Sequence, residues 1–331
     1  MTRRGRRAPT TVYQRRQIRT AELRDLLQEL TTYYEARDYG DDLAGIPNSS
    51  EKLLERAHTL YPNLSPASLP SAPVDGILAW RTPETMQERF PGIPPISLLR
   101  LHRILDTDSI DVICQFYDIL INSGFRFPVD KIDHNRSASS GAHLGVWMHY
   151  SLTPMVTSDS RLRTQRSQVV INALDQFLQV LKDILVPLIR SIYEIHFPHL
   201  WARQAKAHRF VRTFFRSGHR EEFEARVALD FEGAFFCAAI KEGSSKVWHL
   251  DWHDDPNSMT WIIPIGEGWE GAEFCAPQLG IKVPIIPGQV LGALTRRLLH
   301  CAAPMTGGRR LVLTLFCNRW IMKHSDEWIE V

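Results

Sequence analysis

Four residues in the C-terminal half have the types and spacing of an iron site. They are His249, Asp251, His300 and Arg310. Two histidines and one carboxylate can hold Fe(II) on one face of an octahedron, which leaves three coordination positions for a cosubstrate and O₂. The arginine adds a planar guanidinium that can bind a cosubstrate carboxylate through paired hydrogen bonds. The set therefore predicts a non-haem iron oxygenase, with the two histidines and the aspartate as catalytic metal ligands.

A second H-x-D pair lies in the same segment and competes for the same role. His253 and Asp255 have the same strand parity as the first pair, and only one pair can join His300. Pro256 follows at once, which indicates that the strand is ending, so we prefer the first pair. His253 would then support a ligand, face the substrate or lie in solvent. An isolated H-x-D is weak evidence in a chain with 13 histidines. The additional presence of His300 and Arg310 makes the prediction of a metal site stronger.

The metal set lies in a region of short β-rich runs. Strands are expected at 227–231, 235–240, 247–253, 259–264, 281–286, 290–294 and 311–317, with turns between them. Many short strands separated by turns predict a sandwich or jelly roll. Side chains at i and i+2 share a strand face, so His249 and Asp251 can both point into the barrel. By the same rule Arg310 points inward and Arg309 outward. Three further residues share the inward face: Val312, Thr314 and Phe316.

The N-terminal half is expected to be mainly helical. Helices are predicted from near Thr20 and at 109–122, 165–197 and 199–215, and Pro187 should kink or divide the third. The polar or Pro-, Ser- and Gly-rich stretches 45–95 and 135–145 predict irregular structure. The fold class is α+β, with a double-stranded β-helix (jelly-roll) core supported by N-terminal helices. The expected regions are a disordered Arg-rich tail (1–19), a mainly helical region (20–222), the β core (223–320) and a C-terminal tail (321–331).

The composition indicates a globular protein with a basic arm. Hydrophobic residues make up 44% of the chain and charged residues 23%, which is ordinary for a folded domain. The first 19 residues hold seven arginines and no acidic residue, so the rest of the chain is net acidic. Such an arm suits the phosphate backbone of DNA or a nuclear-import receptor, and the alternative is a tail without a partner.

The cysteines and the apolar runs indicate a soluble, intracellular protein. The five cysteines form no C-x-x-C pair and most lie in apolar runs, as is typical of buried free thiols. No secretory signal is visible, and no apolar run reaches the ~18 residues that a membrane span needs. We therefore expect no membrane partner, and the basic arm is compatible with a nuclear location.

The segment 223–320 resembles the double-stranded β-helix core of 2-oxoglutarate/Fe(II) oxygenases. Four pieces carry the resemblance: "HLDWHDD", "GWEGAEFCAPQLG", "IIPGQV" and "LLHCAAPMTGGRRLVLTLF". More narrowly, they are similar to the fungal branch of the TET/JBP group, which oxidises methylated nucleobases. The upstream helices carry no sharp motif of that group.

The resemblance implies a role for each residue of the set. His249, Asp251 and His300 match the iron ligands, and Arg310 matches the arginine that binds the distal carboxylate of 2-oxoglutarate. The implied cofactor and cosubstrates are Fe(II), 2-oxoglutarate and O₂. The family often has Ser or Thr two residues after the arginine, where this chain has Val312, and Thr314 could supply the replacement hydrogen bond. The cysteine-rich DNA-binding region of the animal proteins has no counterpart here.

Three functions follow from these observations. The first is oxidation of a methylated base, such as 5-methylcytosine, which would have to leave the duplex stack. Trp248, Trp252 and Trp261 could stack on such a base, although core packing is the preferred interpretation for each. The second is a 2-oxoglutarate oxygenase that hydroxylates a protein or a small molecule. The third is a catalytically silent relative that binds nucleic acid or another partner, against which the intact iron set argues.

Overall fold

The structure is a computed structural model that describes residues 31–127, 141–149 and 153–330. The tail expected at 1–19 and the helix expected from Thr20 lie outside these residues. The strands are β1 (Thr31–Glu35), β2 (Ile77–Arg81), β3 (Ile96–Leu101), β4 (Gly141–Trp147), β5 (Met155–Val156), β6 (Cys237–Glu242), β7 (Thr260–Gly271), β8 (Phe274–Ala276), β9 (Ile281–Val283), β10 (Val290–Ala293), β11 (Cys301–Ala302) and β12 (Met305–Phe316). The helices are α2 (Ser50–Leu60), α3 (Glu84–Arg89), α4 (Thr107–Asn122), α5 (Leu162–Gln165), α6 (Gln168–His196), α7 (Pro198–Phe214), α8 (Arg220–Ala225) and α9 (Arg319–Glu327).

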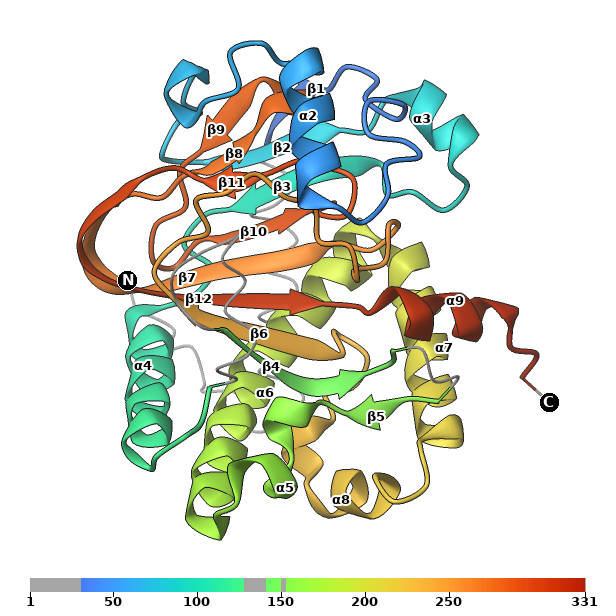
Figure 1. Cartoon of the computed structure of the whole chain (residues 1–331), viewed down its shortest axis with the longest axis vertical. Helices are drawn as coiled ribbons and strands as arrows, with labels where there is room; N and C mark the ends of the chain where they lie inside the picture. Colours follow the sequence, from blue (N-terminus) through green and yellow to red (C-terminus); the bar gives the residue numbers. More distant parts are fainter. Residues whose placement is uncertain (1–30, 128–140, 150–152, 331) are drawn as a thin grey trace, which may run out of the picture.

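The strands form one large and one small sheet. The large sheet has nine strands in the order β1-β2-β3-β10-β7-β12-β6-β4-β5, and the small sheet has the order β11-β8-β9. β1 runs parallel to β2, whereas the remaining pairs of described strands are antiparallel. Figure 1 shows the small sheet beside the upper part of the large one. The expected α+β class with a jelly-roll core is confirmed.

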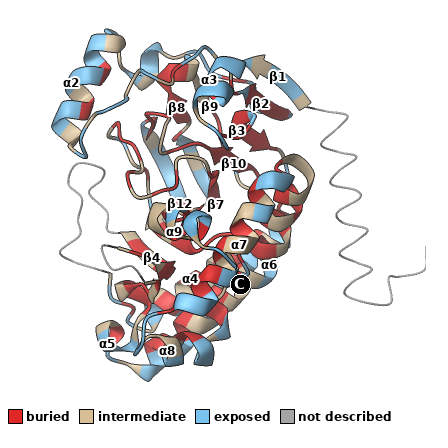
Figure 2. Cartoon of the chain, turned by 90° about the vertical axis from the view of Figure 1, so that its right-hand side faces the viewer, coloured by how far each residue is buried: buried red, intermediate tan, exposed pale blue. Residues whose placement is uncertain are grey.

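Helices cover one face of the large sheet. Figures 1 and 2 place α4, α6 and α7 on the same side of it, and burial is concentrated where α6 meets the sheet. α6 begins at Ser167, whose side chain caps the helix, and its apolar residues recur at three- and four-residue steps. Pro187 does not divide the helix. The hydroxyl of Ser191 donates to the carbonyl of Pro187 at 2.8 Å.

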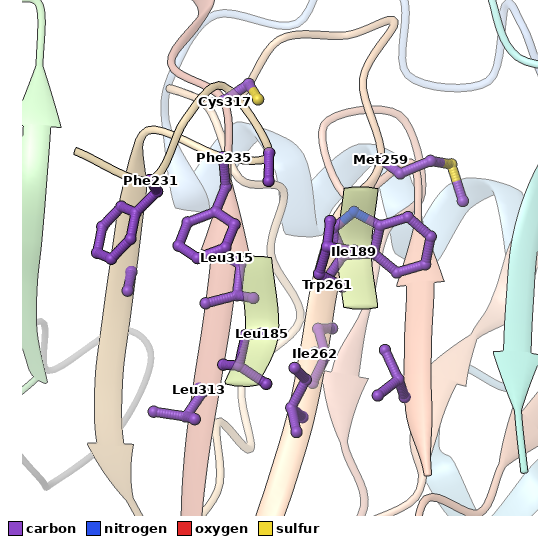
Figure 3. Close-up of a cluster of buried hydrophobic side chains, with 14 of the residues drawn as sticks. Leu185, Ile189, Phe231, Phe235, Met259, Trp261, Ile262, Leu313, Leu315 and Cys317 are labelled. Carbon is purple, nitrogen blue, oxygen red and sulfur yellow. The ribbon is translucent and has the colours of Figure 1, made fainter. Parts of the chain in front are cut away.

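The core between α6 and the sheet shows which face of strands β7 and β12 packs against the helices and which face is turned to the other side. Figure 3 shows Trp261 of β7 and Leu313 and Leu315 of β12 beside Leu185 and Ile189 of α6. All five side chains are almost completely buried. Since side chains alternate along a strand, the even-numbered residues of β12 must point to the opposite face of the sheet.

The N-terminal half contributes more strands than the sequence predicts. β1, β2 and β3 extend the large sheet at one end, and β4 and β5 extend it at the other. The stretch 45–95, expected to be irregular, contains α2, β2 and α3, and β4 occupies most of the described part of the expected loop 135–145. β2 and β3 are buried on both faces, so they lack the polar alternation that identifies a strand in a sequence.

Two short segments also differ from expectation. Residues 227–229 form a 3-10 turn and not a strand, because they follow α8 and pack beside α6. The C-terminal tail expected from residue 321 begins as helix α9, whose first backbone N–H groups are capped by the side chain of Asn318. None of the helices among the described residues is long and apolar enough to cross a membrane.

Candidate metal centre

His249, Asp251 and His300 form a compact group between the two sheets. Each offers one ligand atom, and these atoms lie within 4.8 Å of one another. Asp251 Oδ1 is 3.8 Å from His249 Nε2, and Asp251 Oδ2 is 3.6 Å from His300 Nε2. Among the residues that the structure describes, no other group of three or more such side chains has this geometry. The carboxylate therefore faces both imidazoles at a spacing that one ion can bridge.

The backbone sets the orientation of both imidazole rings. His249 Nδ1 is 2.7 Å from the carbonyl oxygen of Val247, and His300 Nδ1 is 2.9 Å from that of Leu298. A carbonyl oxygen can only accept, so each Nδ1 carries the proton and each Nε2 presents a lone pair toward the group. Such hydrogen bonds fix the tautomer and ring direction of metal-binding histidines.

The H-x-D segment is extended but is not the regular strand expected at 247–253. Only His249 makes a bridge, which pairs it with His300 immediately before β11. The chain then turns, with the backbone N–H of Asp254 bonded to the carbonyl of Asp251 at 3.0 Å. Because the two-residue alternation survives up to Asp251, the two ligands still share a face, while Trp248 and Leu250 point into a separate apolar cluster.

Arg310 is a buried cation without a carboxylate partner among the described residues. Its side chain is 4% exposed and donates from Nη1 to the carbonyl of Gly243 at 2.9 Å. Its Nε has no hydrogen-bond partner there. Burial lowers the pKa of Arg310 to about 10, so the guanidinium stays charged at neutral pH. A buried, incompletely bonded guanidinium is costly, and an incoming carboxylate would offset that cost.

Arg309 has the opposite environment. It is exposed and pairs with Asp118 of α4 at 2.6 Å and with Glu242 of β6 at 2.5 Å. Arg310, Val312, Thr314 and Phe316 instead line the cavity that holds the metal group. The strand alternation inferred from the sequence therefore places the two neighbouring arginines on different faces, as expected.

The cavity has a volume of about 360 Å³ and lies between the two sheets. β4, β6, β7 and β12 of the large sheet form one wall, and β8 and β11 of the small sheet form the other. The metal group and Arg310 share this cavity, which is large enough for a small organic acid together with part of a second molecule.

The second H-x-D pair is split between two environments. His253 lines the cavity, but Asp255 turns away from it. Asp255 binds Arg203 of α7 at 2.5 Å and accepts from the hydroxyl of Ser258 at 2.7 Å. Asp255 thus ties the turn after the metal ligands to α7, and the alternative ligand pair does not assemble with His300.

Two cavity residues that the sequence analysis did not single out are His143 and Trp147 of β4. They line the cavity together with His253 and Phe316. Trp147 is 5.6 Å from His253 and 5.8 Å from Phe316, measured between ring centroids. The sequence feature that could have identified His143 and Trp147 is the strand alternation in 141–148. There Gly141, His143, Gly145 and Trp147 share one strand face.

The tryptophans considered for stacking serve mainly as packing residues. Trp261 is fully buried in the main core, and its indole N–H donates to the hydroxyl of Tyr193 at 3.1 Å. Trp248 and Trp252 belong to the smaller apolar cluster with Leu53 and Ala57 of α2, although Trp252 also touches the cavity. The packing interpretation therefore holds.

The five cysteines are free thiols, and all but Cys114 are buried.

No family model matches this chain. No curated protein matches it either. Among solved structures, the chain is similar to NgTET1 in complex with 5mC DNA, with 15% identity, 75% of this chain and 79% of that chain covered, and a TM-score of 0.47. It is also similar to a 2OG-Fe(II) oxygenase family protein from Burkholderia pseudomallei, with 12% identity, 70% and 87% coverage, and a TM-score of 0.37. A third similar structure is the prolyl-4-hydroxylase of Pseudomonas putida, with 11% identity, 66% and 91% coverage, and a TM-score of 0.34.

The strand arrangement, the His–Asp–His group and the buried arginine are features of the chain itself. The His–Asp–His group has the donor types that can hold Fe(II).

Proposed function

We propose that this protein is an Fe(II)- and 2-oxoglutarate-dependent dioxygenase that oxidises a methylated nucleobase, of which 5-methylcytosine is the example to test. The observation that carries the proposal is the shared cavity of the His–Asp–His group and an unpaired, buried Arg310. The donor set fits Fe(II), since two neutral imidazoles and one carboxylate form the facial triad that leaves three positions open. When bound, the iron would supply O₂ activation, in which 2-oxoglutarate and O₂ yield succinate, CO₂ and one hydroxyl oxygen on the substrate.

The residues of the chain have distinct tasks in this reaction. His249 and His300 present Nε2 to the ion, and the backbone carbonyls on their Nδ1 atoms prevent the rings from turning. Asp251 offsets part of the ionic charge. Arg310 binds the distal carboxylate of 2-oxoglutarate and so orients the other end of that molecule toward the metal.

Val312 and Thr314 lie on the same cavity face as Arg310. Val312 cannot form the hydrogen bond that the family often has at this position. Thr314 is one alternation further along β12, and its hydroxyl can donate to a carboxylate oxygen. We assign this second contact with 2-oxoglutarate to Thr314.

Four cavity residues with aromatic rings, which we call the aromatic wall, support a planar substrate (His143, Trp147, His253 and Phe316). These residues line the cavity that also holds the metal group, and neighbouring ring centroids are 5.6–6.1 Å apart in tilted or edge-to-face contact. Aromatic side chains bind nucleobases by stacking at about 1–3 kcal/mol per base. A base that stacks on one of these rings would share the cavity with the metal group.

The test is an oxidation assay with defined oligonucleotides. Pure protein is incubated with Fe(II), 2-oxoglutarate and O₂ together with methylated or unmodified DNA, and the bases and succinate are measured by mass spectrometry. We expect an oxidised methyl group only on methylated DNA and succinate in equal amount. Succinate formation that is stimulated by a peptide or a small molecule, with no change in any base, would instead support the alternative hydroxylase. Failure to form succinate with iron bound would favour a silent relative.

A further inference from the structure

A second concave surface lies away from the metal cavity and is lined almost entirely by arginines. Arg126, Arg161, Arg163 and Arg166 surround it together with Thr164. Arg126 follows α4, and the others lie in and around α5. The cavity volume of about 390 Å³ can accommodate a phosphate group and its hydration shell.

These four guanidinium groups have no acidic partner in the described part of the chain. Among the residues that the structure describes, no carboxylate forms an ion pair with any of them. Arg161 contacts only a ring nitrogen of His219, at 3.4 Å, and its buried Nε has no hydrogen-bond partner there. Burial and the neighbouring Arg161 and Arg216 lower the pKa of His219.

Two acidic residues near α5 bond other groups. Asp159 accepts from the backbone N–H of His143 at 2.9 Å. Glu222 binds Arg226 at 2.7 Å and accepts from the backbone N–H of Leu162 at 3.3 Å. In the part of the chain that the structure describes, most other exposed arginines are paired, as Arg209 is with Glu330 and Arg212 with Asp230. Four arginines around one hollow, without an ion pair among the described residues, therefore form a local positive field that attracts a polyanion.

Hydrogen bonds connect the arginine surface (Arg126, Arg161, Arg163 and Arg166) to strand β4. The side chain of Gln165 bonds the backbone of Arg126 in both directions, at 2.9 and 3.2 Å, and donates to the carbonyl of Asp159 at 2.8 Å. Asp159 in turn bonds β4 at His143, a residue of the metal cavity. β4 is the second-last strand of the large sheet, and Figure 2 shows α5 beside it at the lower left.

We propose that Arg126, Arg161, Arg163 and Arg166 form a docking surface for the phosphodiester backbone of duplex DNA. The proposal deepens, and rests on, the proposed oxidation of a base in DNA. The hydrogen bond between Asp159 and His143 connects the arginine hollow to β4, which lines the cavity, and we infer that one DNA molecule contacts both surfaces. Guanidinium groups suit phosphate because they are always charged and donate in pairs. Such contacts fix register and affinity without reading the sequence.

The experiment measures DNA binding separately from chemistry. Full-length protein without iron is titrated into a fluorescent duplex with one central 5-methylcytosine, and anisotropy is followed from 50 to 200 mM salt. The test variant is Arg126→Gln/Arg163→Gln, which removes two exposed side chains that make no side-chain contact among the described residues. The control is Lys52→Gln/Arg56→Gln on α2, which removes the same charge at the far end of the molecule (Figure 1).

Each lost phosphate contact should reduce the slope of log K against log salt by about 0.9, so the test variant should lose roughly 1.8. Its affinity should fall by about tenfold at the lowest salt. The control should keep the slope of the wild type. Equal losses in both variants, an unchanged slope in the test variant, or binding of a phosphorylated peptide without binding of the duplex would overturn the inference.

The outcomes distinguish this inference from the proposed function. If the wild type oxidises methylated DNA while the test variant binds DNA as the wild type does, the docking surface is wrong and the function stands. If the test variant loses the salt slope but no base is ever oxidised, the docking surface stands and the function is wrong.

Discussion

His249 and His300 face each other as a hydrogen-bonded antiparallel pair. The backbone N–H of His249 donates to the carbonyl of His300 at 2.9 Å, and the reverse bond is 3.0 Å. Residues paired in this way lie directly opposite each other, so two ligands separated by 50 residues of sequence acquire a fixed spacing. Their ring centroids are 4.2 Å apart. The metal group thus depends on the backbone pairing as well as on the side chains.

Arg310→Ala should weaken 2-oxoglutarate binding without removing iron. A charged hydrogen bond contributes about 1.5–3 kcal/mol, so the KM for 2-oxoglutarate should rise by roughly 10- to 100-fold. The matched control is Arg309→Ala, which removes the neighbouring arginine on the other face of β12 and should leave that KM unchanged. Steady-state kinetics with varied 2-oxoglutarate makes the comparison. Equal KM values in the two variants would show that Arg310 does not bind the cosubstrate.

Asp251 and Asp255 should respond to substitution in opposite ways. Asp255→Ala breaks a buried pair with Arg203, so the free energy of unfolding should fall by about 3 kcal/mol while iron binding remains. Asp251→Ala should leave the metal-free protein as stable as the wild type and abolish iron binding. Chemical denaturation and iron analysis of the folded variants measure both effects. Loss of iron in Asp255→Ala alone would mean that the second H-x-D pair supplies the ligand.

Substitution of Trp147 should affect substrate binding, whereas substitution of Trp248 should affect the stability of the fold. Trp147→Ala should raise the KM for methylated DNA by roughly 5- to 100-fold, because one stacking contact is worth about 1–3 kcal/mol. Trp248→Ala should lower the free energy of unfolding by about 3–5 kcal/mol, since it empties a buried site in the apolar cluster. Substrate kinetics and denaturation are measured on both variants. A Trp147 variant with normal KM would remove the aromatic wall from substrate recognition.

Thr314→Val should have a smaller effect than the loss of Arg310. Thr314 makes one hydrogen bond to the carboxylate, where Arg310 can make two and adds an opposite charge. We expect the lower end of the roughly 1.5–3 kcal/mol of a bond to a charged group, so the KM for 2-oxoglutarate should rise about 10-fold. Thr314→Ser keeps the hydroxyl and should behave as the wild type. If the valine and serine variants gave the same KM, the hydroxyl of Thr314 would have no part in binding 2-oxoglutarate.

The sequence predicts which side chains share a face within each segment, because that relationship is local in sequence. The two-residue alternation at His249 and Asp251 and at Arg309 and Arg310 decides which side chains share a face, and it operates even where the segment is not a regular strand. The long helix α6 was predictable for the same reason, since its apolar stripe repeats over many turns.

The rest depended on contacts between distant segments. β2 and β3 are strands because they lie inside a nine-stranded sheet, and their own residues show no alternation. The His253/Asp255 ambiguity was resolved by Arg203, a residue of α7 whose position relative to the turn no local pattern predicts. The arginine surface likewise joins Arg126 to α5 through the side chain of Gln165.

The most direct test of the central claim is a titration of Fe(II) into the metal-free protein under anaerobic conditions. The account predicts one Fe(II) per chain for the wild type and for His253→Ala. It predicts loss of that site in each of His249→Ala, Asp251→Ala and His300→Ala, all three folded. One tightly bound Fe(II) in all three ligand variants would contradict it.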